Sequence, residues 1–169
     1  MLSFALDRNV PKAELYAELA QATEAILAGE TDALANLCNA AAGVYHALPG
    51  INWAGFYLRR GEELVLGPFQ GLPACVRIPL GRGVCGTAAE RRETVVVRDV
   101  GEFPGHIACD SASRSEIVVP LVWDGDLVGV LDVDAPEPGR FDEADRAGLE
   151  RLAAVLVPRI RWAALRDAR

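Results

Sequence analysis

The sequence predicts an α+β fold in which a largely antiparallel sheet has helices before, within and after it. Two observations support this class. Apolar residues recur at helical spacing near both ends of the chain, and strand-forming runs alternate with tight turns in the middle. The 169 residues suit one domain spanning 1–169, without repeats or a linker. At this length about 70% of the unfolded surface can be buried, so the fold needs no disulfide or metal for stability.

Two helices are expected in the N-terminal segment 11–48. Their expected ranges are 11–28 and 31–48. The first repeats apolar residues at helical spacing: Leu15, Leu19, Ala22 and Ile26. Thr31 or Asp32 can cap the start of the second helix. Its predicted apolar face consists of Leu34, Leu37, Cys38, Ala41, Tyr45 and Leu48. A buried cysteine behaves as a small hydrophobic residue, so we expect Cys38 in the core.

The sheet and its loops are expected over residues 51–134. Two β-hairpins are predicted because strand-forming runs flank tight turns at Arg60-Gly61 and Asp124-Gly125. The strands of these hairpins are expected at 51–59, 62–69, 116–123 and 126–134. Between the hairpins, the expected elements are an extended piece over 77–80, a short helix over 83–92 and a strand over 94–98. Pro120 indicates an edge position or a bulge, because proline cannot donate to the hydrogen-bond ladder.

A long loop and a C-terminal helix complete the predicted order. Residues 100–115 are rich in Gly, Pro, Ser and Asp and show no periodicity, and loops of this length in compact domains are usually functional or disordered. The last helix is expected over 142–165, where Asp142 and Asp145 resemble a capping box. Its apolar stripe consists of Leu149, Leu152, Ala153 and Leu156. Pro158 should kink or stop this helix.

Charge and hydropathy exclude several classes of partner. The formal net charge is −7, so no basic field would attract nucleic acid. The longest apolar runs are far shorter than the roughly 20 residues that span a bilayer, and the N-terminus does not resemble a secretory signal. We therefore expect a cytoplasmic protein without a membrane partner. In that reducing compartment its four cysteines are expected to be free, catalytic or metal-bound rather than structural disulfides.

Three of the cysteines lie in loop-like, glycine-flanked settings where a core would not place them. Cys75 follows Gly-Leu-Pro-Ala, Cys85 lies between Val84 and Gly86, and Cys109 lies in the long loop. A mobile backbone suits a thiol that attacks a substrate and then meets a second thiol, because disulfide closure needs Cα atoms about 4.4–6.8 Å apart. A zinc site using these cysteines with His106 is an alternative, although the spacings match no usual zinc pattern.

Residues 81–86 satisfy the dinucleotide pattern G-x-G-x-x-G, which is weak evidence by itself. The pattern should follow a buried strand and open a long helix within a parallel βαβ unit. Here Pro79 breaks the preceding strand, the helix is short and no parallel crossover is visible. The sequence therefore predicts no nucleotide cofactor.

Two predicted strands carry chemistry on one face. In the first, the period of two places Trp53 and Tyr57 on the same side as Gly55, which could leave a slot lined by aromatic rings. Ordinary core packing is the simpler interpretation of these rings. In the last strand, Asp132 and Asp134 face away from the apolar side. Two such carboxylates could be solvated, or in a pocket they could bind an amine and donate a proton, together with Glu116 on the partner strand.

These motifs taken together closely resemble the free methionine-R-sulfoxide reductases, which are stand-alone GAF-domain enzymes. The resemblance covers nearly the whole chain, and Cys38 falls outside the family's trio of cysteines. The matching segments are Asn52 to Tyr57, the three cysteines at their spacings, His106 to Asp110, Ser115 to Val118 and Gly129 to Asp134. The resemblance implies a GAF fold with a six-stranded antiparallel sheet flanked by helices, commonly as a homodimer.

The resemblance also implies an activity and roles for residues. The reaction would be reduction of free L-methionine (R)-S-oxide to methionine, with electrons from thioredoxin and with neither a metal nor a bound cofactor. Cys109 would be the nucleophile, Cys75 the resolving thiol and Cys85 a secondary thiol that relays or exchanges the disulfide. The remaining roles concern substrate binding. Trp53 and Tyr57 would hold the methyl-sulfoxide end, and Glu116, Asp132 and Asp134 would hold the ammonium group and assist protonation of the departing oxygen.

Local sequence and family resemblance disagree about the nucleophile. A predicted helix N-terminus lowers the pKa of a thiol, so local sequence favours Cys85. The choice of Cys109 depends on the resemblance. Two other functions compete with the reductase: a GAF module that senses a small ligand with its cysteines as a redox switch, and reduction of another small sulfoxide or disulfide.

Overall fold

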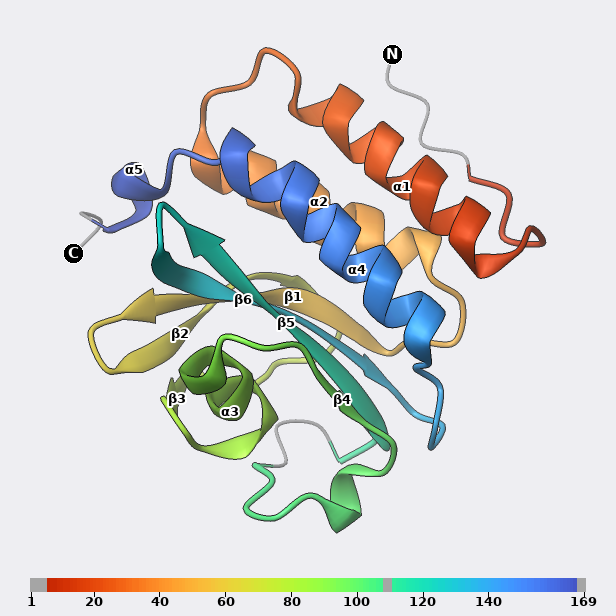
Figure 1. The fold of residues 1–169 in the computed structure, drawn as a ribbon, viewed down its shortest axis with the longest axis vertical. Helices are drawn as coiled ribbons and strands as arrows, with labels where there is room; N and C mark the ends of the chain where they lie inside the picture. Colours follow the sequence, from red (N-terminus) through yellow and green to blue (C-terminus); the bar gives the residue numbers. More distant parts are fainter. Residues whose placement is uncertain (1–5, 108–110, 167–169) are drawn as a thin grey trace.

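The computed structural model describes residues 6–107 and 111–166 and contains a six-stranded antiparallel sheet in the order β3-β2-β1-β6-β5-β4 (Figure 1). The strands are β1 (Trp53–Arg60), β2 (Glu63–Gln70), β3 (Arg77–Pro79), β4 (Val95–Val97), β5 (Ser115–Trp123) and β6 (Asp126–Ala135). The α-helices are α1 (Lys12–Leu27), α2 (Ala33–Ala47), α3 (Gly83–Arg91), α4 (Glu143–Leu156) and α5 (Trp162–Arg166), with short 3₁₀ turns η1 (Val100–Glu102) and η2 (Val157–Arg159). The predicted α+β class and the element order are confirmed.

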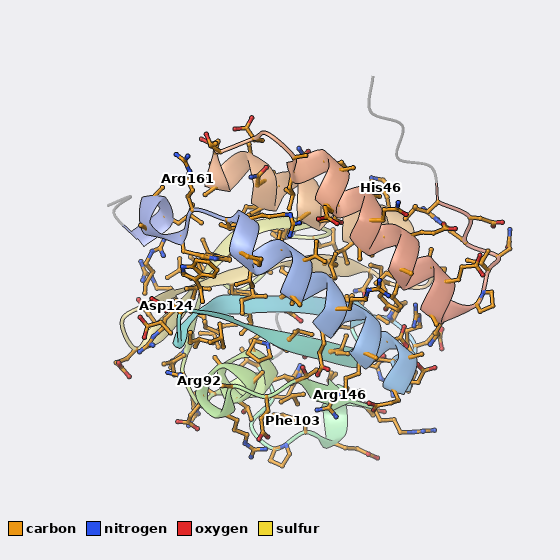
Figure 2. The ribbon with its side chains drawn as sticks, turned by 45° about the horizontal axis from the view of Figure 1, so that its top comes forward. His46, Arg92, Phe103, Asp124, Arg146 and Arg161 are labelled. Atoms are coloured by element: carbon orange, nitrogen blue, oxygen red, sulfur yellow. The ribbon has the colours of Figure 1, made fainter. Side chains whose placement is uncertain are left out.

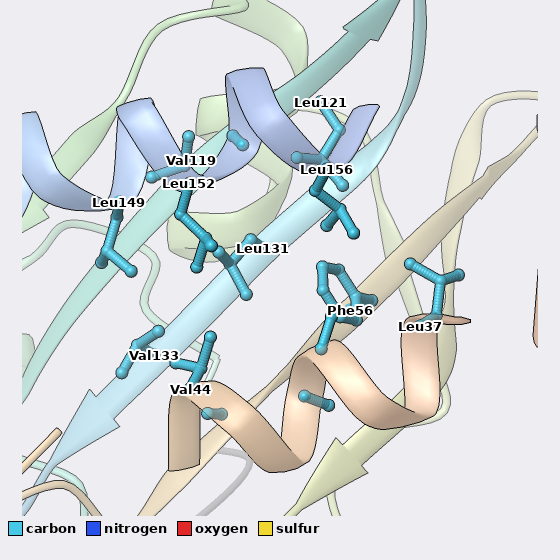
Figure 3. Packing of buried hydrophobic residues seen from close by; sticks show 14 of the residues in the cluster. Leu37, Val44, Phe56, Val119, Leu121, Leu131, Val133, Leu149, Leu152 and Leu156 are labelled. Carbon is cyan, nitrogen blue, oxygen red and sulfur yellow. The ribbon is translucent and has the colours of Figure 1, made fainter. Parts of the chain in front are cut away.

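Different helices pack on the two faces of the sheet. Helices α1, α2 and α4 lie over one face, and α3 lies against the other (Figure 1). Alternate residues of the central strands supply the two cores, because successive strand side chains point to opposite faces. Phe56 and Leu131 belong to the helix-covered core with Leu37, Leu152 and their neighbours (Figure 3). Tyr57 belongs to the second core, beneath α3.

Local capping signals correctly predicted the helix ends. The Asp32 side chain accepts a hydrogen bond from the backbone N–H of Ala35 at the start of α2. Asp142 and Asp145 form the predicted capping box of α4. The carboxylate of Asp145 is also buried, where it accepts a hydrogen bond of 2.9 Å from the hydroxyl of Tyr16 in α1. Helix α4 ends at Leu156, just before Pro158, as the expected stop requires. The single helix expected over 142–165 is therefore divided into α4, the 3₁₀ turn η2 and the short helix α5.

The predicted apolar face of α2 is correct at Leu37, Ala41 and Leu48 but wrong at Leu34 and Cys38. Cys38 is exposed, and the side chain of Leu34 is 54% exposed. The buried face consists of Ala33, Asn36, Leu37, Ala40, Ala41, Gly43, Val44 and Ala47. Small residues let the helix approach the sheet closely, and Asn36 is tolerated there because its amide donates to the carbonyl of Glu30. Tertiary packing therefore buries the alanine-rich face of α2 and leaves the larger side chain of Leu34 exposed.

Turn chemistry fixes both hairpins. The first turn is Gly61-Glu62, one residue later than expected, with Gly61 at φ +61°. The second is the predicted Asp124-Gly125 turn, where both residues have positive φ as a type I′ turn requires. Arg92, at the end of α3, donates to the carbonyl of Gly125 and ties the helix to this hairpin; Figure 2 labels Arg92 and Asp124. The irregularity expected near Pro120 occurs in β5 between Leu121 and Val122.

In the described part of the predicted loop over 100–115, the 3₁₀ turn η1 is the one regular element before β5 begins at Ser115. Among the described helices, none has the length and apolar character needed to cross a membrane.

Candidate functional site

A narrow cavity lies between the sheet and the cover formed by α3 and neighbouring loops. It has a volume of about 30 Å³, which is room for only about two waters. Its lining consists of Trp53, Tyr57, Ala74, Ile78, Gly83, Val84, Cys85, His106, Ile107, Ser113, Glu116, Asp132 and Asp134. The sequence assigned site roles to eight residues, and the structure brings six of them together around this cavity: Trp53, Tyr57, Cys85, Glu116, Asp132 and Asp134. Of the other two, Cys75 lies beside the cavity and Cys109 lies outside the described residues.

Strand register explains why three carboxylates meet here. Strands β1, β6 and β5 are adjacent, and Asp134 on β6 pairs with Trp53 on one side and with Glu116 on the other. Asp132, two residues earlier on the same face, pairs with Gly55. The period of two thus points both aspartates at the cavity, while the apolar residues between and beside them enter the other core.

The aromatic rings pack against one another and leave no slot at Gly55. The ring of Trp53 stacks on Tyr57 at 5.9 Å between centroids and on Phe69 at 5.3 Å. A Cβ atom built on Gly55 would lie 2.4 Å from the Cβ of Phe69 and 2.6 Å from Trp53. The space beside Gly55 is therefore filled by Phe69 of β2 together with the Trp53 indole, which agrees with ordinary core packing rather than with a slot. Trp53 and Tyr57 nevertheless line one wall of the cavity, although both side chains are buried.

Two aromatic side chains also hold the segment that carries Cys75. The indole N–H of Trp53 donates to the carbonyl of Leu72 at 3.1 Å, and the hydroxyl of Tyr57 donates to the carbonyl of Cys75 at 3.0 Å. Burial raises the pKa of Tyr57, with nearby acidic groups acting in the same direction, so the hydroxyl remains a donor. The predicted aromatic residues thus hold the backbone of disulfide-bonded Cys75 as well as lining the cavity.

Acidic groups in the cavity are held close to a buried thiol. Glu116 and Asp132 are each only 6% exposed, and the Sγ of Cys85 donates to Oε1 of Glu116 at 3.7 Å. Burial raises the pKa of Asp132 from 3.8 to about 7. Burial, with the charge of Asp132 second, also holds the pKa of Glu116 well above its usual value. At least one carboxyl of this cluster can therefore carry a proton near neutral pH and donate it.

The prediction that Cys85 has a lowered thiol pKa is wrong. Cys85 does lie in the first turn of α3, but it is 4% exposed and faces two carboxyl groups. Burial raises its pKa, and the charges of Asp132 and Glu116 act in the same direction. These neighbours come from β5 and β6, and they outweigh the field of a short helix. The local argument for Cys85 as the nucleophile therefore fails.

His106 adds a group whose partner the sequence did not indicate. Its Nε2 lies 3.8 Å from Oε2 of Glu116, and burial lowers its pKa. Sequence reasoning placed His106 near Cys109 or in a zinc set, rather than beside Glu116. It also missed Ile78, Ile107 and Ser113, which carry no motif and are found only through the strand pairing and the loop that follows η1.

The cysteines differ in state. Cys75 is disulfide-bonded, whereas Cys38 and Cys85 carry free thiols. One group within the described residues has a geometry that could hold a metal ion: single ligand atoms of Cys85, Glu116 and Asp132 lie within 4.8 Å of one another. The same acidic set suits an ammonium group. It differs from the zinc set considered from the sequence, since it contains two carboxylates.

Comparison with known proteins agrees with this architecture. The model of the GAF domain family matches residues 22–159, and the fold and the site together define a GAF-domain protein. The chain is 55% identical to the free methionine-R-sulfoxide reductase of Escherichia coli (strain K12) over 145 residues, which are 86% of this chain and 88% of that protein. It therefore belongs to the family of free methionine-R-sulfoxide reductases, a group of oxidoreductases.

Two further similarities extend over most of the chain. The free methionine-R-sulfoxide reductase of Saccharomyces cerevisiae is 44% identical over 156 residues, covering 88% of this chain and 87% of that protein. A crystal structure of free methionine-R-sulfoxide reductase from Neisseria meningitidis in complex with its substrate is 48% identical. It superposes with a TM-score of 0.91, covering 98% of this chain and 99% of that chain.

Proposed function

We propose that the protein reduces free L-methionine (R)-S-oxide to L-methionine through a cysteine sulfenic acid and an intramolecular disulfide. Thioredoxin then reduces the disulfide, and the protein acts in the cytoplasm as a homodimer. One observation carries the proposal: stacked aromatic rings, three carboxyl groups and the segment of disulfide-bonded Cys75 converge on a single cavity. The aromatic rings suit the apolar methyl group of the substrate, and the carboxyl groups suit its cationic amine and can protonate its sulfoxide oxygen.

The proposed substrate-binding roles follow from the chemistry of each wall. Trp53 and Tyr57 bind the methyl-sulfoxide end, because their apolar rings suit its methyl group. Glu116, Asp132 and Asp134 bind the ammonium group, and a protonated member of the cluster donates to the departing oxygen. The cavity of about 30 Å³ is too small for the amino acid, so binding requires the pocket to widen.

The redox steps balance with two thiols of the chain. The thiolate of Cys109 accepts the sulfoxide oxygen and becomes a sulfenic acid, while the substrate sulfur takes up two electrons and becomes a thioether. The thiol of Cys75 then attacks the sulfenic sulfur, a disulfide forms, and the oxygen leaves as water. The disulfide state of Cys75 supports this assignment, as does the free state of Cys85, whose raised pKa suits a secondary thiol rather than an attacking one.

Selectivity for the free amino acid has a physical basis. Replacing the ammonium group by a peptide amide would leave buried carboxyl groups without their cation, which costs a few kcal/mol, or a factor of about 10² or more in specificity. The alternative function is a GAF module that binds a small ligand without turnover. The buried Glu116 and Asp132 would bind an amine in either case, so turnover separates the two.

A coupled assay tests the proposal. NADPH consumption is followed with thioredoxin and thioredoxin reductase while the protein is offered free methionine-R-sulfoxide, its S epimer or an N-acetylated form. Turnover on the first compound alone is the expected result. Turnover on the acetylated form at a similar rate would contradict the role of the carboxyl groups, and binding of the free sulfoxide without NADPH consumption would favour the sensor.

A further inference from the structure

The segment that joins β2 to β3 is tethered through its backbone. Residues 71–76 form no helix or strand, yet three hydrogen bonds hold their backbone in place. Trp53 and Tyr57 donate to the carbonyls of Leu72 and Cys75, and the carbonyl of Val76 accepts from the backbone N–H of Leu66 at 2.9 Å. These bonds fix the backbone of the segment, but the side chains of Leu72 and Val76 remain exposed to solvent.

Two apolar side chains of the same segment are exposed. Leu72 and Val76 are 63% and 62% exposed, which makes them the most exposed of the large apolar side chains in residues 6–107 and 111–166. They stand on either side of half-buried, disulfide-bonded Cys75. Scattered exposed apolar residues are common, but two that flank a redox-active sulfur on a tethered backbone point to contact with a partner.

We propose that Leu72 and Val76 form the docking surface for the protein dithiol that reduces the disulfide of Cys75. This inference rests on the proposed function, since it concerns the recycling step. The occupant must bring a thiolate to a sulfur of this disulfide, and a whole protein cannot enter the inner cavity even when that cavity widens for the substrate. The reductant must therefore approach from the outer surface, where these two side chains lie.

Charge near the segment supports an apolar contact. Arg77, the next residue along the chain, is paired with Glu63 across the β2–β3 ladder, so this cation is already neutralised. The contact would therefore depend on buried apolar area and respond weakly to salt. The fitting partner is a thioredoxin-class protein that presents its reactive dithiol within an apolar surface.

The exchange balances in atoms and electrons. A thiolate of the partner attacks one sulfur of the Cys75 disulfide, that S–S bond breaks, and a mixed disulfide forms as the leaving sulfur takes a proton. The second partner thiol then attacks the mixed disulfide and releases the reduced chain. Two electrons pass from the partner dithiol, which becomes a disulfide, to the two cysteines of this chain.

The test compares the double variant Leu72→Ser/Val76→Ser with wild type and with Leu34→Ser, a control that removes an exposed leucine on α2. The expected result is a KM for thioredoxin raised about ten-fold in the double variant and unchanged in the control, in proportion to the loss of two interface anchors. Turnover with dithiothreitol and the single-turnover yield of methionine should stay within two-fold of wild type.

The outcomes separate this inference from the proposed function. An unchanged KM for thioredoxin in the double variant, or an equal rise in Leu34→Ser, would overturn the docking surface while leaving the reductase intact. A wild-type protein that forms no methionine with dithiothreitol would instead overturn the proposed function. If the double variant loses turnover with dithiothreitol, the single variants decide: each should raise KM for thioredoxin alone, and loss of both activities in each would overturn the proposal.

Discussion

Replacing Asp132 by asparagine should stabilise the folded protein at alkaline pH while removing most of its activity. Burial raises the pKa of this carboxyl from 3.8 to about 7, so the folded state holds a proton that the unfolded state releases near pH 4. Between about pH 4 and 7 the folded state therefore binds more protons than the unfolded state. Because the free energy of unfolding then falls as pH rises, wild type loses stability across this window.

The size of the effect follows from the width of the window. Three pH units at 1.36 kcal/mol each correspond to about 4 kcal/mol lost by pH 8, an upper figure because the group interacts with Glu116 and Cys85. Asparagine carries no charge at any pH and escapes this loss. Its amide must still be accommodated among buried acceptors, which costs about 1–3 kcal/mol at every pH. The net stabilisation of Asp132→Asn above pH 7 is therefore about 1–3 kcal/mol at most.

Urea unfolding of the oxidised proteins at pH 5, 6, 7 and 8 measures this prediction. The difference in unfolding free energy between Asp132→Asn and wild type should rise steadily with pH. Asp126→Asn is a matched control, because Asp126 lies on the same strand but is exposed. A difference that stays constant from pH 5 to 8, or one that falls, would refute the reasoning that burial holds a proton on Asp132.

Four further variants test separate parts of the site. Gly55→Ala places a Cβ atom 2.4 Å from that of Phe69, so it should destabilise the protein by about 1–3 kcal/mol in thermal unfolding; a neutral effect would show that the rings have room to move. Tyr57→Phe removes the hydrogen bond to the carbonyl of Cys75 and should cost about 1 kcal/mol and slow recycling by thioredoxin more than the first turnover; equal slowing of both would contradict the positioning role. Cys75→Ser should keep a single-turnover burst of methionine but fail to recycle, and Cys109→Ser should abolish both; a full burst from Cys109→Ser would contradict its role as nucleophile.

Local signals in the sequence were sufficient for most of the fold. The Asp124-Gly125 turn and the capping box of Asp142 and Asp145 each depend on a few neighbouring residues, so their chemistry can be recognised without knowing the tertiary structure. The strand period of two likewise placed Asp132 and Asp134 on one face. The direction of that face, toward a cavity rather than toward solvent, depended on α3 covering it.

The errors occurred where distant segments decide the outcome. The face of α2 was misjudged because close packing of small residues against the sheet outweighed the larger Leu34, which left Cys38 exposed. The pKa of Cys85 was misjudged in direction because Glu116 lies 31 residues away in sequence yet accepts a hydrogen bond from its thiol. The space beside Gly55 is filled by Phe69 of the neighbouring strand as well as by Trp53 of β1, and the contribution of Phe69 could not be deduced from the periodicity of β1.

The most direct test of the proposed chemistry is a single turnover of the fully reduced protein with one equivalent of free methionine-R-sulfoxide. Thiol titration and peptide mapping of the quenched sample should show that two thiols disappear for each methionine formed, with a disulfide joining Cys75 to Cys109. Methionine formed without loss of thiols, or a disulfide that omits Cys75, would contradict the account.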